Sequence, residues 1–126
     1  LGDVYKRQEL GDIFGVKLST REEVVPYGRK LQEMGAQNVL ISMAGEGAVL
    51  IAADGQSMGA PAPKGTLVNG VGAGDSMVAG FLTGWMEKKD YVHAFHMGIA
   101  AGSASAFSEN LATREEVLQV LQQVEQ

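Results

Sequence analysis

Apolar residues recur with a helical period in the second half of the chain. Between residues 76 and 88 they are spaced by four, which places them on one face of a helix. A second apolar stretch, residues 91–107, is rich in glycine and alanine and follows Asp90, a residue type that often caps helices. Thr113 and Glu116 form a capping box before a third, amphipathic stretch. The pattern therefore predicts three consecutive helices.

Two further helices are predicted near the start of the chain. The first is a short one over residues 9–16. Overlapping capping boxes begin at Ser19 and at Thr20, and they predict a second helix that runs to about residue 34. Pro26 falls inside this second pattern, which predicts either a kink or an irregular first turn.

Short apolar or extended runs separate the two groups of helices. They predict strands over residues 38–43, 48–52, 57–63 and 66–68. Asp54-Gly55 stands between the second and third runs and is a strong hairpin signal. Helices packed on a sheet define an α/β fold. We expect this sheet to be incomplete, because the chain offers too few strands to cover its helices.

Composition and charge narrow the class of protein. The 126 residues are 45% hydrophobic, as in a globular domain with its own core. The formal net charge of −5 argues against a nucleic-acid partner, and no apolar run reaches the ~18 residues of a membrane span. The chain has no cysteine, which excludes disulfides and zinc–thiolate sites, and the cytoplasm is the expected compartment. Because Leu1 stands where a start methionine is usual, we expect a processed chain or a fragment.

The candidate chemistry lies in residues 68–82, which read VNGVGAGDSMVAGFL. A strand runs into a glycine-rich turn and then into a helix, whose first amides and dipole form an anion site. Asp75, in the first helical turn, could accept a proton from an attacking hydroxyl group. A dinucleotide fingerprint fails because its third glycine would fall on Asp75, and no Walker A sequence is present. From the residues alone, a plain tight turn with Asp75 as a dipole partner stays open.

The same segment resembles the C-terminal signature of the PfkB family of carbohydrate kinases, which are ribokinase-like. The matching positions are Asn69, Gly72, Ala73, Gly74, Asp75, Ala79, Gly80, Phe81 and Leu82. Gly70 departs from the family, which usually has a small hydroxylated residue or proline there. The resemblance implies the C-terminal part of a three-layer α/β/α sandwich. It also implies an anion hole at Gly72, Ala73 and Gly74, with Asp75 as the general base.

Further site residues follow from this resemblance. Residues 41–48 resemble the family's nucleotide loop, which would place Ser42, Gly45 and Gly47 near the phosphates of ATP, although a simple hairpin turn explains them equally well. Ser103 and Asn110 are candidates for the adenine side, where core packing is the competing interpretation.

A metal-linked residue and a domain boundary follow in the same way. Glu9 matches the family's glutamate that organises magnesium and its waters, and a solvated carboxylate is the alternative. The resemblance starts at Glu9, so we expect residues 1–8 to lie outside the family domain and residues 9–126 to form its C-terminal ATP-binding portion.

The resemblance thus implies ATP- and Mg²⁺-dependent phosphoryl transfer to a sugar phosphate. Fructose 1-phosphate is the expected acceptor, with its 6-hydroxyl giving fructose 1,6-bisphosphate, and tagatose 6-phosphate is the alternative. A non-catalytic nucleotide-binding fragment is the rival from another class, and the chain alone is expected to have little or no activity. We expect no nucleic acid or membrane as partner. The sequence does not set the oligomeric state, and a homodimer of a full-length protein stays open.

Overall fold

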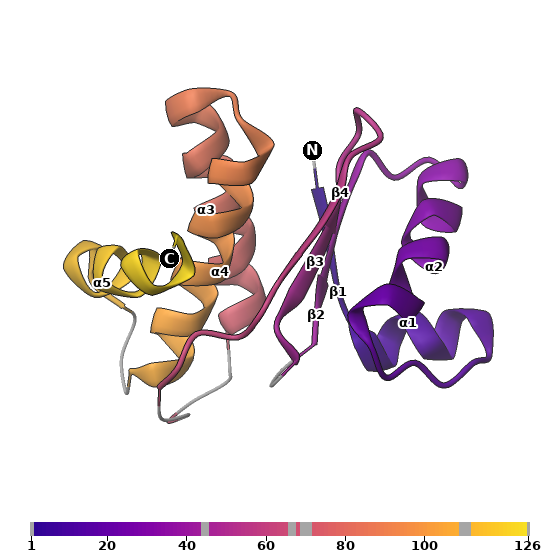
Figure 1. Ribbon diagram of the computed structural model, residues 1–126, viewed down its shortest axis with the longest axis horizontal. Helices are drawn as coiled ribbons and strands as arrows, with labels where there is room; N and C mark the ends of the chain where they lie inside the picture. Colours follow the sequence, from indigo (N-terminus) through magenta and orange to yellow (C-terminus); the bar gives the residue numbers. More distant parts are fainter. Residues whose placement is uncertain (1, 44–45, 66–67, 69–71, 109–111, 126) are drawn as a thin grey trace. The chain divides into compact units, whose positions relative to one another are not determined.

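The computed structural model describes residues 2–43, 46–65, 68, 72–108 and 112–125. The chain divides into two compact units, Leu1–Pro61 and Ala62–Gln126. The first contains the sheet and two helices, and the second contains three helices (Figure 1). Within the described ranges, no helix is long and apolar enough to cross a membrane.

The first unit is built on a four-stranded sheet in the order β1-β2-β3-β4. Its strands are β1 (Gly2–Lys6), β2 (Asn38–Ser42), β3 (Ala48–Ile51) and β4 (Ser57–Ala60). β1 pairs with β2 in parallel, and the other two pairs are antiparallel. The predicted strands at 38–43, 48–52 and 57–63 are confirmed, while most of the one predicted at 66–68 lies outside the described residues. β1 was not predicted.

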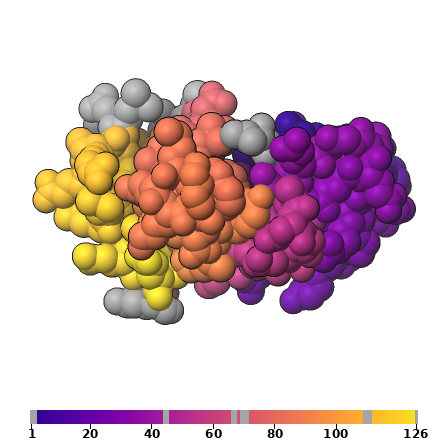
Figure 2. All heavy atoms as spheres, turned by 90° about the horizontal axis from the view of Figure 1, so that it is seen from above, coloured from indigo at the N-terminus to yellow at the C-terminus, as the bar shows by residue number. Residues whose placement is uncertain are grey.

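Two helices pack on one face of this sheet (Figure 1). They are α1 (Arg7–Phe14) and α2 (Arg21–Glu33), both close to their predicted bounds. Thr20 caps α2 as expected, and the helix continues through Pro26. The shared core contains Leu10, Val24, Leu31, Val39, Ile41 and Ile51. α1 and α2 also contact each other, and Figure 2 shows the atoms of the first unit in indigo to magenta.

The second unit consists of α3 (Ala73–Lys88), α4 (Tyr91–Phe107) and α5 (Arg114–Glu125). α3 contacts α4 along its length, because glycines on both helices let the backbones approach. A Cβ atom on Gly80 would lie 2.5 Å from the carbonyl oxygen of Met97. α4 and α5 share a second core around Ala100, Ala104 and Leu121. The three predicted helices are confirmed, although α3 begins three residues earlier than position 76.

Candidate functional site

The glycine-rich turn ends in the first turn of α3. Gly72 is the N-cap, with a left-handed backbone at φ 83° that suits glycine. The Ser76 N–H donates to the Gly72 carbonyl oxygen at 2.9 Å, which is the first bond of the helix ladder. The amides of Ala73, Gly74 and Asp75 therefore precede the ladder and have no carbonyl partner within the helix. Such amides, together with the positive end of the helix dipole, are the groups that bind anions at helix N-termini in other proteins.

Two glycines of this turn differ from those elsewhere in the unit. A Cβ atom placed on Gly72 or on Gly74 would meet no described residue within 4 Å. At Gly84, by contrast, the same atom would lie 2.9 Å from the Cα of Ala94. Packing against the described residues therefore explains Gly84 but does not explain Gly74, whose φ is also ordinary. Open space above Gly74 is where an anion could reach the backbone.

Asp75 is the third residue of α3 and its side chain is exposed. Its carboxylate and the amides that precede the helix ladder thus belong to one helical turn. This arrangement fits a hydroxyl nucleophile that loses its proton to the carboxylate while the amides hold a phosphoryl group. The predicted grouping of Gly72, Ala73, Gly74 and Asp75 on a single turn agrees with the described geometry.

α4 passes directly beside this turn at Gly102. A Cβ atom on Gly102 would lie 3.1 Å from the carbonyl oxygen of Ala73 and 3.3 Å from the Cβ of Met77. Ser103, predicted to contact ATP, follows Gly102 in the chain and is half-buried. Asn110, predicted with it, lies outside the described residues. The four-residue spacing of Gly98 and Gly102 predicts close helix packing, and the approach of both glycines to α3 confirms it.

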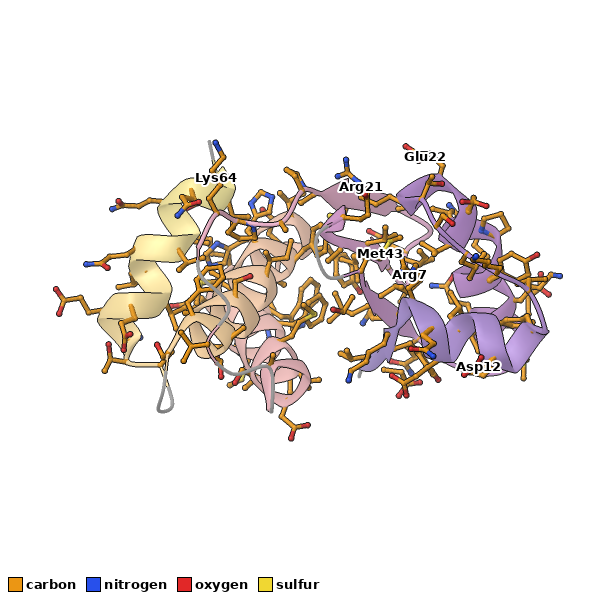
Figure 3. All side chains as sticks on the ribbon, turned by 90° about the horizontal axis from the view of Figure 1, so that it is seen from below. Arg7, Asp12, Arg21, Glu22, Met43 and Lys64 are labelled. Atoms are coloured by element: carbon orange, nitrogen blue, oxygen red, sulfur yellow. The ribbon has the colours of Figure 1, made fainter. Side chains whose placement is uncertain are left out.

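The remaining predicted residues that the structure describes, Ser42, Gly47 and Glu9, lie near one end of the sheet in the first unit. Lys6 and Ser42 are register partners at the ends of the parallel strands β1 and β2. Figure 3 labels Arg7 and Met43, the residues that directly follow the two strands in the sequence. In α/β folds, ligands bind beyond this carboxyl end of parallel strands. Ser42, which is half-buried, therefore lies at the end of the sheet where ligands bind in such folds. Gly45 lies outside the described residues.

Gly47 and Glu9 each accept a backbone hydrogen bond near this end of the sheet. Gly47 has φ 94°, and its carbonyl oxygen accepts the Met43 N–H at 2.8 Å, closing the turn between β2 and β3. The Glu9 carboxylate accepts the Lys6 N–H at 2.9 Å and so caps α1. Among the described residues, no group of three His, Cys, Asp or Glu side chains could hold a metal ion.

Comparison with known sequences gives a consistent result. The sequence-family model described as "pfkB family carbohydrate kinase" matches residues 5–118. A 1-phosphofructokinase of Bacillus subtilis is 52% identical over 116 residues, covering 92% of this chain and 38% of the relative. A D-tagatose-1-phosphate kinase of Klebsiella oxytoca is 32% identical over 118 residues, covering 93% of this chain and 38% of the relative. The chain thus spans about two-fifths of the length of these curated relatives.

Solved structures show the same likeness. A crystal structure of a presumed phosphofructokinase from Staphylococcus aureus superposes with a TM-score of 0.91 and 36% identity, covering 98% of this chain and 40% of that one. Arabidopsis thaliana ribokinase, complexed with ribose and ATP, has a TM-score of 0.78 at 23% identity, covering 94% and 40%. The second likeness concerns the fold alone. Together they confirm the predicted fold, the C-terminal part of a ribokinase-like α/β structure.

Proposed function

Because the chain belongs to the pfkB family of carbohydrate kinases, we propose that it supplies the catalytic base and the phosphate-binding turn of such an enzyme. The reaction is transfer of the γ-phosphoryl group of ATP to a hydroxyl group of a sugar phosphate. The single observation that carries the proposal is the first turn of α3. There, amides without a carbonyl partner in the helix, a Gly74 that no described residue packs against and the exposed carboxylate of Asp75 occur within one helical turn.

The backbone amides and the Asp75 carboxylate of this turn have different proposed roles. The amides of Gly72 to Asp75 would hold the negative charge that develops on the transferring phosphoryl group. Asp75 would take the proton of the sugar hydroxyl as the new O–P bond forms. Within the second unit, we propose Ser103 and Asn110 as residues that contact the nucleotide. Ser42, Gly45 and Gly47 of the first unit are proposed separately as phosphate contacts, from the family resemblance alone.

Magnesium belongs to the proposed reaction as a companion of ATP. When bound, Mg²⁺ would offset the negative charge of the ATP phosphates. The described side chains hold no three-ligand group for it, and the Glu9 carboxylate already accepts the Lys6 N–H. The donor set therefore fits a metal held mainly by phosphate oxygens and water, with Glu9 acting indirectly through its free carboxylate oxygen.

We propose fructose 1-phosphate as the acceptor, with its 6-hydroxyl giving fructose 1,6-bisphosphate. The support is the 52% identity to a protein named 1-phosphofructokinase. A tagatose phosphate is the second candidate, supported by the 32% identity to a D-tagatose-1-phosphate kinase. That name points to tagatose 1-phosphate rather than to the 6-phosphate considered from the sequence. Comparing kcat/KM for the two 1-phosphates would decide between them.

The test of the base uses a hybrid kinase, in which the matching 116 residues of this chain replace those of the Bacillus subtilis relative. Asp75→Asn should lower kcat by about 10²–10⁴-fold, the usual contribution of a general base. The affinity for ATP should stay within about twofold, because the amides are unchanged. Asp12→Asn, at an exposed site on α1 (Figure 3), is the matched control and should leave kcat unchanged. Near-normal turnover in Asp75→Asn would overturn the assignment.

The chain by itself should have little or no kinase activity. Phosphoryl transfer depends on positioning both substrates, and the chain spans only about two-fifths of its relatives. An assay with ATP and fructose 1-phosphate, using the isolated chain beside the hybrid kinase, measures this. Turnover by the isolated chain at a rate close to that of the hybrid would contradict the expectation. Nucleotide binding without turnover would favour the non-catalytic alternative for the chain itself.

A further inference from the structure

A side chain on α5 holds the segment that leads into the glycine-rich turn. The Lys64 N–H donates to Oε1 of Gln123 at 2.9 Å, and Nε2 of Gln123 donates to the Lys64 carbonyl oxygen at 3.3 Å. The amide of Gln123 thus pairs with the backbone of Lys64 as a neighbouring strand would. Figure 3 shows Lys64 beside α5 with its side chain directed outward, so the backbone makes the contact.

Two more contacts fix the same segment within the second unit. Gly65 lies against the ring of Phe107, where a Cβ atom on Gly65 would be 2.5 Å from a ring carbon. The Val68 N–H donates to the Ala106 carbonyl oxygen at 2.8 Å. That carbonyl is one of the last four of α4, which have no partner within the helix. Residues 64, 65 and 68 are therefore each tied to the ends of α4 or α5.

These contacts lie immediately before the candidate site. Val68 precedes Gly72 by four residues, so α4 and α5 hold the backbone at positions close in the sequence to the candidate site. The amides of an anion site act only when they are held in the correct direction before the charge develops. Among the described side chains, Gln123 is the one that binds this segment through both a donor and an acceptor.

We propose that Gln123 is a positioning residue for the phosphate-binding turn of the proposed kinase, acting through the backbone of Lys64. The predicted effect on kcat rests on the proposed function, whereas the hydrogen bonds between Gln123 and Lys64 do not. Gln123 does not contact the substrates in this scheme. Its loss would release the backbone of Lys64, eight residues before Gly72, and would thereby lower the fraction of bound ATP that is aligned for transfer.

The experiment compares Gln123→Ala with Gln122→Ala, the neighbouring exposed glutamine on α5, in the hybrid kinase. Gln123→Ala should lower kcat about tenfold while KM for the sugar phosphate changes less than about twofold, as expected for misalignment. Gln123→Glu keeps the acceptor for the Lys64 N–H but loses the donor, and it should restore part of kcat. Gln122→Ala should match the unaltered hybrid.

Amide hydrogen exchange in the chain as given supplies a second readout. Gln123→Ala should speed exchange at Val68, whose bond partner is Ala106, whereas Gln122→Ala should not. Equal Val68 exchange in the two variants, or equal kcat, would overturn the positioning role. An inactive hybrid with Gln123 intact would instead overturn the proposed function. The exchange result would then still decide whether Gln123 holds the segment.

Discussion

Gly47 lies so close to the main chain of Ala60 that a Cβ atom at position 47 would overlap the Ala60 carbonyl oxygen. The same atom would lie 2.8 Å from two backbone atoms of Pro61. Ala48, the next residue, pairs with Ala60 in the β3–β4 ladder, which holds the two segments at this distance. The backbone of the first unit therefore requires glycine at position 47, whether or not a nucleotide binds there.

Gly47→Ala should destabilise the first unit by more than about 2 kcal/mol, because it adds a backbone overlap to the cost of a left-handed alanine. Urea unfolding of the chain measures the change. Gly55→Ala is the matched control, since Gly55 has nearly the same φ, 95°, but open space around it. It should cost only the conformational part, about 1–2 kcal/mol. Equal losses at the two positions would show that the contact with Ala60 is not tight in solution.

Local signals in the sequence were sufficient for most of the helices and for the hairpin. Thr20, Asp90 and the Thr113–Glu116 pair cap their helices as predicted, because a cap depends only on residues within one turn. The turn at Asp54-Gly55 likewise joins β3 to β4. β1 was missed because five residues show no period, and its strand partner β2 lies more than thirty residues further along the chain.

The candidate site was predictable in its residues but not in its surroundings. Gly72 to Asp75 could be grouped because they are consecutive, yet α3 was expected to begin at Ser76 since glycines usually indicate a loop. Gly72 instead serves as the N-cap through its left-handed backbone, which leaves no side-chain signal. The approach of Gly102 to Ala73 depends on how two helices pack, and spacing along one helix does not determine it.

Gly74→Ala separates stability from function. Alanine is favoured over glycine in a helix by up to about 1 kcal/mol, and its Cβ would enter open space. The variant should therefore unfold at equal or higher urea concentration. In the hybrid kinase, kcat/KM for ATP should fall at least about tenfold, because the new methyl group occupies the space proposed for a phosphate. Thr83→Ala, exposed on the same helix, should give the stability gain alone. Full activity in Gly74→Ala would exclude an anion at this position.

The Glu116 carboxylate should make stability depend on pH. The Thr113 N–H, followed by the Ser108 hydroxyl and the Thr113 side chain, lowers the pKa of Glu116 from its ordinary value of 4.5. A lowered pKa in the folded state stabilises the protein above the pKa of the unfolded state. That stabilisation is lost as pH falls through the folded value. The difference in unfolding free energy between the unaltered chain and Glu116→Ala should be full at neutral pH and should shrink below pH 4.5.

Glu115→Ala is the control for this pH series. It removes the same charge from the same helical turn, but Glu116 alone of the two accepts the Thr113 N–H and the Ser108 hydroxyl in the described contacts. Urea unfolding at a series of pH values, repeated with both variants, should show the larger and more pH-dependent loss for Glu116→Ala. Identical curves for the two variants would attribute the effect to the helix dipole rather than to these bonds.

Gly102→Ala should displace the first turn of α3, which contains the proposed anion hole. Its Cβ would lie 3.1 Å from the Ala73 carbonyl oxygen, so the first turn of α3 must shift by a few tenths of an ångström. Overpacking of this kind costs about 1–3 kcal/mol. Because Ala73 belongs to the proposed anion hole, kcat of the hybrid kinase should also fall, by about tenfold for a displaced set of donors.

Gly98→Ala is the control that isolates the catalytic effect. A Cβ atom there would lie 3.1 Å from the Met77 carbonyl oxygen, which is an equal approach one turn further from the anion site. Both variants should lose similar stability in urea unfolding, but only Gly102→Ala should lower kcat when activity is measured well below the unfolding transition. A similar fall in kcat for both would mean that the whole α3–α4 contact, rather than the position of Ala73, limits the reaction.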